Sequence, residues 1–195
     1  MRLSKVLVYR QLIVHYAKAN FLYPSLVAGL ITQESGGQVD IISVAGAVGL
    51  MQIMPKEAGF TTRPTRAELL DPEINIKTGC ELLKSLRTKY KTQAGMLAAY
   101  FGAVNSSGYP TIATDATGSN GWDYVRLVEA HALDYIDLDC DTGFLADEDF
   151  RQYAPNTGEW REVAINLLGV CNDALQAGRS MKGKCGEIAS VWGDR

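Results

Sequence analysis

The chain has 195 residues and a mass of 21.2 kDa, enough for one hydrophobic core and too short for two domains of ordinary size. Apolar residues make up 47% and charged residues 21%, with 6 prolines against 19 glycines, which excludes disordered, collagen-like and coiled-coil proteins. The net charge of -3 argues against a nucleic-acid-binding protein, and no apolar run approaches the ~18 residues of an integral membrane segment.

The spacing of apolar residues is helical in the first third of the chain. Residues 3–17 repeat apolar side chains at three- and four-residue steps, with Ser4 as a candidate N-cap. Pro24 opens a second helix that runs to Glu34, and the glycines at 36 and 37 supply its stop. Short apolar runs broken by glycine then predict a small hairpin or irregular loops near residues 38–54.

Helical patterns also dominate the rest of the chain. They cover residues 71–90, 92–104, 122–136 and 158–178, and residues 105–121 have the composition of a loop. The sequence therefore predicts a mainly α fold with one β excursion near 38–54. We expect a single domain over residues 1–195, with a core at about 22–135 and extra C-terminal helices in an extension at about 141–195.

Glu34 is the first candidate for chemistry. It follows the apolar run of residues 26–31 and lies at a helix C-terminus. Burial and the negative end of the helix dipole both disfavour its ionised form, so we expect a raised pKa. A carboxylic acid that keeps its proton near neutrality can protonate a leaving oxygen.

The residues around Glu34 carry a family resemblance. The segments ESGG (34–37), GLMQIMP (49–55), AAY (98–100) and WDYV (122–125) occur in the order of the motifs of the soluble lytic transglycosylase catalytic domain. The chain resembles this family, whose lysozyme-like fold is shared with goose-type lysozymes, over about residues 22–135. One departure is visible: the family follows the tyrosine of its third motif with Asn-Ala-Gly, whereas here Tyr100 is followed by Phe101. Asn105 is the candidate replacement for the missing amide.

The resemblance implies that Glu34 is the sole catalytic acid and base. It also implies a substrate-binding set: Ser35, Gly49, Met51, Gln52, Tyr100 and Tyr124. Glycines at 46 and 49 would let the backbone approach a sugar, and Gln52 offers a donor and an acceptor to an acetamido group or to Glu34. Met51 is of a type that more often fills a core, and either tyrosine could bring its hydroxyl to the acid or be an ordinary core tyrosine.

The reaction depends on whether a second carboxylate assists Glu34. Ordinary glycosidases use two, and the candidates downstream are Asp40 and Glu57, neither of which falls where goose-type lysozymes place their assisting aspartates. The resemblance therefore implies cleavage of the β-1,4 bond between N-acetylmuramic acid and N-acetylglucosamine without water, forming 1,6-anhydromuramic acid ends. The alternatives are a goose-type lysozyme that hydrolyses the same bond with Asp40 or another carboxylate, and a non-catalytic glycan-binding or virion structural protein.

The remaining signals are weak. The four cysteines, 80, 140, 171 and 185, show no zinc spacing and are read as buried thiols, with 171 and 185 the first pair to test as a disulfide. The acidic stretch at 137–148 imitates a calcium loop imperfectly and is read as a solvated turn. We expect no metal and no cofactor.

Location follows from the expected substrate, the glycan strands of peptidoglycan, which place the protein at the bacterial cell wall. The N-terminal residues show no signal-peptide pattern, so we expect a phage-encoded or virion-associated protein, or export by a non-classical route. The sequence leaves the oligomeric state open.

Overall fold

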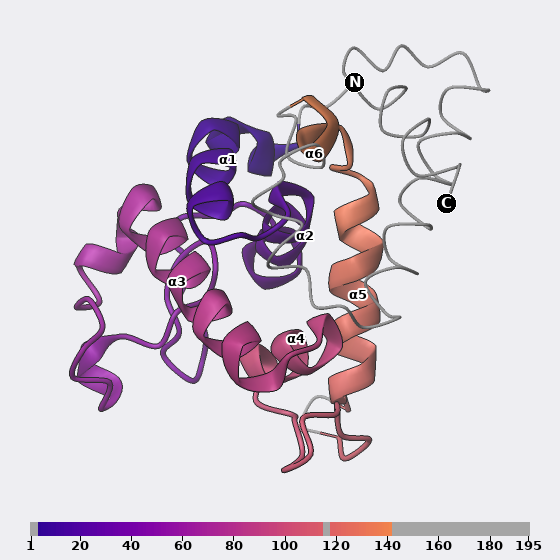
Figure 1. Ribbon diagram of the computed structural model, residues 1–195. Coiled ribbons are helices and arrows are strands. Elements are labelled where there is room, and N and C mark those ends of the chain that lie inside the picture. The colour runs from indigo at the N-terminus through magenta and orange to yellow at the C-terminus, as the bar shows by residue number, and fades with distance from the viewer. Residues whose placement is uncertain (1–3, 115–117, 142–195) are drawn as a thin grey trace, which may run out of the picture. The chain divides into compact units, whose positions relative to one another are not determined.

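The computed structural model describes residues 4–114 and 118–141 (Figure 1). The chain divides into two compact units, Met1–Tyr135 and Ile136–Arg195. The described part of the first unit contains, in chain order, η1 (Lys5–Tyr9), α1 (Arg10–Ala19), α2 (Pro24–Ser35), η2 (Lys56–Ala58), η3 (Glu68–Leu70), α3 (Pro72–Tyr90), α4 (Gln93–Phe101) and α5 (Gly121–Leu133). The described part of the second unit contains α6 (Asp137–Asp141).

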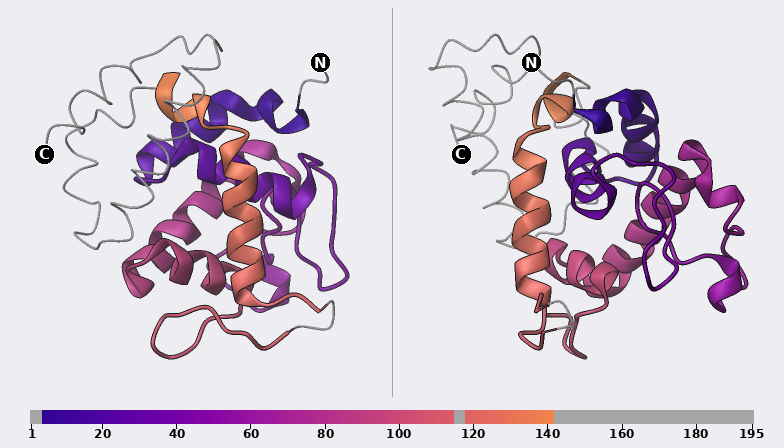
Figure 2. Two further views of the ribbon diagram at one scale, coloured as in Figure 1. Left: turned by 90° about the vertical axis from the view of Figure 1, so that its right-hand side faces the viewer. Right: turned by 180° about the vertical axis from the view of Figure 1, so that it is seen from behind.

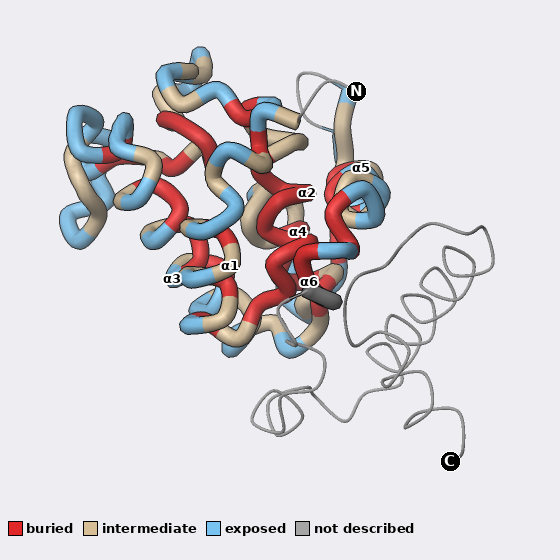
Figure 3. The backbone as a smooth tube through the Cα atoms, turned by 90° about the horizontal axis from the view of Figure 1, so that it is seen from above, coloured by how far each residue is buried: buried red, intermediate tan, exposed pale blue. Residues whose placement is uncertain are grey.

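Helix α2 forms the centre of the first unit. Every residue from position 24 to 31 is buried, so the helix is apolar on all sides and must be covered all round (Figure 3). Helix α5 runs alongside α2, and α4 meets α5 near its N-terminal end (Figure 2). Gly29 allows the close approach of α2 to α5, because a Cβ there would lie 2.6 Å from the backbone nitrogen of Ala132.

Side-chain caps fix where several helices begin. Asp71 accepts hydrogen bonds from the backbone amides of Glu73 and Ile74 at the start of α3, and Thr92 accepts one from Gly95 at the start of α4. Ser4 caps η1, as its position in the sequence predicts. The first part of the expected helix, η1, has 3-10 geometry, and the α-helical geometry begins with α1.

Residues 38–54 form an irregular loop. Two isolated antiparallel bridges, Ile42 to Val48 and Val48 to Ile53, are its only β pairing, and the described residues contain no named strand. The expected β excursion is thus reduced to these bridges. The mainly α fold is confirmed for the described residues, and none of the helices there is both long and apolar enough to cross a membrane.

Several expectations lie outside the described residues. These are the C-terminal helices at 141–195, the pairing of Cys171 with Cys185, and most of the acidic stretch at 137–148. The single domain with a helical extension stays a prediction.

Candidate active site

Glu34 lies in the last turn of α2, which ends at Gly36 in the left-handed conformation with φ +58°. Its side chain is only partly accessible to solvent. Burial raises the pKa of the Glu34 carboxyl from 4.5 to about 7, and a hydrogen bond from Tyr124 opposes that rise without cancelling it. Glu34 therefore holds a proton in a large fraction of molecules at neutral pH.

Tyr124 reaches Glu34 from α5. Its side chain is 4% exposed, and its hydroxyl donates a hydrogen bond to Oε1 of the carboxyl group. Among the described residues no donor reaches the other oxygen, Oε2. Burial and the nearby Glu34 raise the pKa of Tyr124 well above its usual value, so the phenol stays protonated as a donor.

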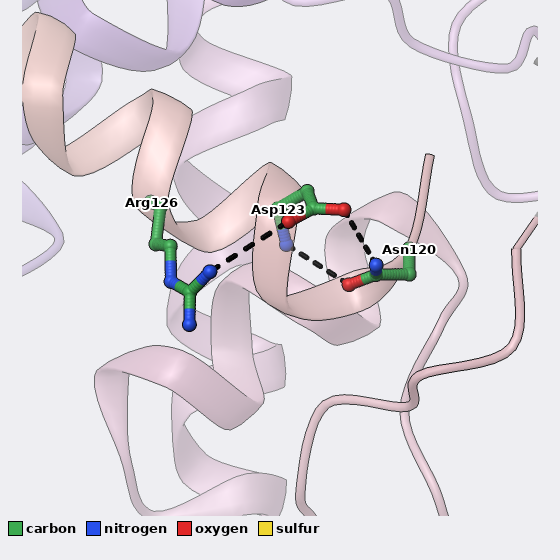
Figure 4. A network of polar contacts seen from close by, with 3 residues as sticks. All are labelled: Asn120, Asp123 and Arg126. Carbon is green, nitrogen blue, oxygen red and sulfur yellow. Dashed lines mark hydrogen bonds and ion pairs between the residues drawn. The ribbon is translucent and has the colours of Figure 1, made fainter. Parts of the chain in front are cut away.

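The N-terminus of α5, about one turn before Tyr124, is fixed by polar contacts. Asn120 caps the helix by accepting a hydrogen bond from the Asp123 amide at 3.0 Å, and its own side-chain amide donates to the Asp123 carboxylate (Figure 4). Arg126 lies 3.8 Å from the same carboxylate. These contacts set the N-terminal turn that carries Tyr124.

A second group of contacts holds the loop at 48–52. Asn75 of α3 is fully buried; its Oδ1 accepts from the Met51 amide at 2.8 Å, and its Nδ2 donates to the carbonyls of Val48 and Leu69, both at 2.8 Å. Tyr100 of α4 donates its hydroxyl to the carbonyl of Met51 at 2.6 Å. Both peptide groups of Met51 are therefore fixed from neighbouring helices.

Tyr100 does not bond the acid, in contrast to Tyr124. The pKa of its phenol is raised well above the usual value, first by burial and then by the charge of Glu34, so the two groups are neighbours without a direct hydrogen bond. Of the two tyrosines expected near the acid, the structure brings one into contact and assigns the other to the loop.

Ser35 and Gln52 also bond the backbone. The Ser35 side chain is buried; its hydroxyl lies 2.8 Å from the Leu50 carbonyl and accepts from the Gly37 amide at 3.1 Å, which ties the end of α2 to the loop. The Gln52 amide donates to the carbonyls of Gly49 and Ile41 at 3.0 and 3.2 Å. Gln52 itself has a left-handed backbone with φ +47°.

Two of the residues expected to bind substrate, Gly49 and Met51, are buried. Met51 is fully buried, and its sulfur lies 2.3 Å from where a Cβ of Gly79 would be, so its side chain belongs to the core. Gly49 has φ +75°, and a Cβ there would lie 2.4 Å from the Asn75 side chain. The close approach that the structure shows at Gly49 is therefore to the side chain of Asn75.

Phe101, which follows Tyr100 where the family has an asparagine, packs against α5. Phe101 stacks on Tyr124 with ring centroids 4.7 Å apart and planes inclined by 14°. Asn105, the candidate replacement for the missing amide, is exposed, and its Oδ1 accepts from the backbone amides of Ser107 and Tyr109 in a local turn.

The candidate second carboxylates do not take part in this constellation. Asp40 is exposed, and both oxygens of Glu57 accept from the Arg66 amide, at 3.1 and 3.0 Å. Burial and the bond from Tyr124 are the causes of the Glu34 shift, and no neighbouring acid contributes. The described residues hold no cluster of three metal-binding side chains. Cys80 is a buried thiol, and burial raises its pKa.

The contacts of Asn75 and Phe101 were not predicted from the sequence. Asn75 left one usable signal, since an amide inside an otherwise apolar helical stripe needs buried hydrogen-bond partners. The sequence shows that Phe101 stands where the family has an amide. No pattern in the chain predicts that its ring lies beside Tyr124.

Comparison with known proteins places the chain near one family of domains. Residues 11–107 match the Transglycosylase SLT domain family. Over 90 residues the chain is 37% identical to membrane-bound lytic murein transglycosylase C of Actinobacillus pleuropneumoniae, covering 42% of this chain and 25% of that protein. Over 71 residues it is 38% identical to endo-type membrane-bound lytic murein transglycosylase A of Klebsiella pneumoniae, covering 32% of this chain and 35% of that protein.

A solved structure shares the fold. The lytic transglycosylase Slt of Pseudomonas aeruginosa, in the form of an inactive mutant, matches with a TM-score of 0.53 and 23% identity over 66% of this chain and 24% of that one. The chain thus spans about a quarter to a third of the length of these relatives. They are bacterial proteins, and they give no support to a phage origin.

Proposed function

We propose that the chain, whose residues 11–107 match the Transglycosylase SLT domain family, cleaves the β-1,4 bond between N-acetylmuramic acid and N-acetylglucosamine in peptidoglycan without water, leaving 1,6-anhydromuramic acid ends. The observation that carries this proposal is the half-buried carboxyl of Glu34, whose pKa is raised to about 7 by burial, with the Tyr124 hydroxyl on one of its oxygens. Its proton is available at neutral pH, where an ordinary carboxylate would have lost it.

Glu34 acts first as an acid and then as a base. The proton on Oε2 passes to the glycosidic oxygen as the bond from that oxygen to C1 of the muramyl residue breaks, with the acetamido group stabilising the positive charge on C1. The Glu34 carboxylate then takes the proton of the muramyl 6-hydroxyl, whose oxygen bonds to C1 and closes the anhydro ring. Glu34 ends protonated, as it began, and no water is consumed.

The isolation of Glu34 from other acids supports this route over hydrolysis. An inverting enzyme needs a second carboxylate to activate water, and a retaining enzyme needs one as nucleophile. Asp40 is exposed and Glu57 is bonded to the Arg66 amide, so neither is held at the acid. The substrate's own hydroxyl is then the nucleophile.

The other residues have positioning roles in this proposal. Tyr124 orients the carboxyl group, and Ser35 fixes the end of α2 against the loop. Tyr100 and Gln52 hold the backbone of the loop, which Ser35 ties to the end of α2. Gly49 and Met51 contribute through the backbone conformation and not through side-chain contact.

We place this activity at the bacterial cell wall and its machinery within residues 22–135. The proposal makes no use of residues 142–195, and a virion or a non-classical export route stays a prediction.

Product analysis tests the proposal. Purified sacculi are digested in water enriched in oxygen-18, and the released muropeptides are analysed by mass spectrometry. We expect anhydro products with no label. Reducing ends that carry the heavy oxygen would show hydrolysis and overturn the proposed route.

Two variants assign the reaction to Glu34. Glu34→Gln keeps the shape and removes the transferable proton, so release should fall by roughly 10²–10⁴-fold. Glu81→Gln makes the same chemical change at an exposed site on α3 and should release products at the rate of the unaltered protein. Release by Glu34→Gln at that same rate would contradict the assignment.

A further inference from the structure

We propose that Phe101 is a positioning residue that acts through Tyr124: its ring stacks on the tyrosine ring and keeps the phenol aimed at Glu34. The inference rests on the proposed function and adds to it a residue whose position the family resemblance would have filled with an amide. The hydrogen bond to Glu34 holds the hydroxyl of Tyr124, whereas Phe101 contacts its ring.

The geometry places Phe101 at a fixed point. It is the last residue of α4, and Gly102 at φ +89° ends the helix immediately after it. Its ring lies nearly parallel to that of Tyr124, with a 14° angle between the planes and 4.7 Å between the centroids. A ring stacked in this way blocks rotation of the tyrosine about its own side-chain torsions, which would swing the hydroxyl away from Oε1.

Phe101 can influence the site only by packing, because its side chain is apolar. A phenylalanine has no donor or acceptor, so it cannot bond a sugar or the carboxyl as an asparagine could. Asn105 has the nearest side-chain amide that follows, and its Oδ1 accepts from the backbone amides of Ser107 and Tyr109. The orientation of the acid on this side therefore depends on packing between α4 and α5.

The pKa of Glu34 reports on its hydrogen bond with Tyr124, because burial and that bond are the causes of its shift. Tyr124 reaches it from α5 and Tyr100 lies near it from α4, while Arg63 and Cys80 act on Tyr100. The pKa of both tyrosines is raised above the usual value, so neither ionises while Glu34 titrates.

A double-mutant cycle tests the inference on a soluble peptidoglycan fragment of defined length. We expect Phe101→Leu to lower kcat by about three- to tenfold, in line with the strength of an aromatic pair, and to leave KM unchanged. Phe101→Tyr keeps a stacking ring and should recover most of the loss. In the Tyr124→Phe background, Phe101→Leu should cost nothing further, since the hydroxyl it positions is gone.

Two outcomes would overturn the inference. Losses that multiply in the double variant would mean that Phe101 acts independently of the Tyr124 hydroxyl. A rise in KM without a change in kcat would mean that Phe101 contacts the glycan instead. Thermal unfolding of each variant shows whether Phe101→Leu is folded, and Phe101→Tyr supplies the comparison if it is not.

A second readout needs no activity. The Glu34 carboxyl carbon is followed by carbon-13 NMR during a pH titration. Loss of the Tyr124 bond raises the pKa of Glu34, so Phe101→Leu should move the titration midpoint up, in the direction of Tyr124→Phe and by less. An unchanged midpoint refutes the positioning role. An unaltered protein that releases no anhydro product refutes the proposed function instead.

Discussion

The hydroxyl of Tyr124 donates a hydrogen bond to Oε1 of Glu34, across 90 positions of sequence. The two effects on the carboxyl group oppose each other: burial favours the protonated form, and the donated bond favours the ionised form. Burial dominates and sets the pKa at about 7, so the acid is poised between giving a proton and taking one back. That balance suits the successive acid and base roles that we propose for Glu34.

The first prediction concerns the pH dependence of activity. The proposed first step needs protonated Glu34, and its pKa is about 7 in the folded protein. We expect kcat/KM on a soluble peptidoglycan fragment to fall with rising pH above this value, by about tenfold per pH unit. Initial rates measured between pH 5 and 9 check this. A limb centred near pH 4.5 would show that burial does not hold the proton on the acid.

The second prediction concerns the Tyr124 hydroxyl. Tyr124→Phe removes a bond that lowers the pKa of Glu34, so the limb in the pH profile should move upward. We expect kcat to fall roughly ten- to hundredfold, as for loss of a hydrogen bond to a charged group. Tyr100→Phe is the matched control, because its hydroxyl bonds the Met51 carbonyl, and its limb should stay in place. Equal shifts in both variants would contradict the assignment.

The third prediction links Glu34 to stability. Its folded pKa of about 7 lies above the value of 4.5 for an unperturbed carboxyl group, so the folded state holds the proton more tightly. The associated stabilisation is complete below about pH 4.5 and is lost as pH rises through 7. The free energy of unfolding of Glu34→Gln minus that of the unaltered protein should therefore increase by roughly 1–3 kcal/mol from pH 4 to pH 8.

Urea unfolding at several pH values measures that gain. Glu81→Gln, at an exposed site, should give a difference that does not vary with pH. A flat difference for Glu34→Gln as well would show that position 34 ionises as it would in water.

The fourth prediction separates two reasons for glycine. Gly49 and Gly59 both have positive φ, at +75° and +95°, but only at Gly49 would a Cβ meet other atoms. Gly59→Ala should cost about 1–2 kcal/mol for the backbone conformation alone. Gly49→Ala should cost about 1–3 kcal/mol more, because it also collides with Asn75. Equal losses in thermal unfolding would mean that the loop moves away from α3 freely.

Much of the helical pattern was predictable from local chemistry. Pro24, Gly36 and Asp71 act within one turn of their own positions, so a reader of the sequence can place the boundaries of α2 and the start of α3 from them. The raised pKa of Glu34 was predictable in direction, because the apolar run before it requires burial.

The sequence by itself thus determined the described helices, the family motifs and the direction of the Glu34 pKa shift, since each depends on neighbours in the chain. Only the tertiary structure decided which groups surround that acid. Tyr124 bonds Glu34 while Tyr100 bonds Met51, and Gly49 makes room for Asn75, because these contacts join helices far apart in sequence. Spacing along one chain carries no record of which side chains such packing brings within hydrogen-bond distance.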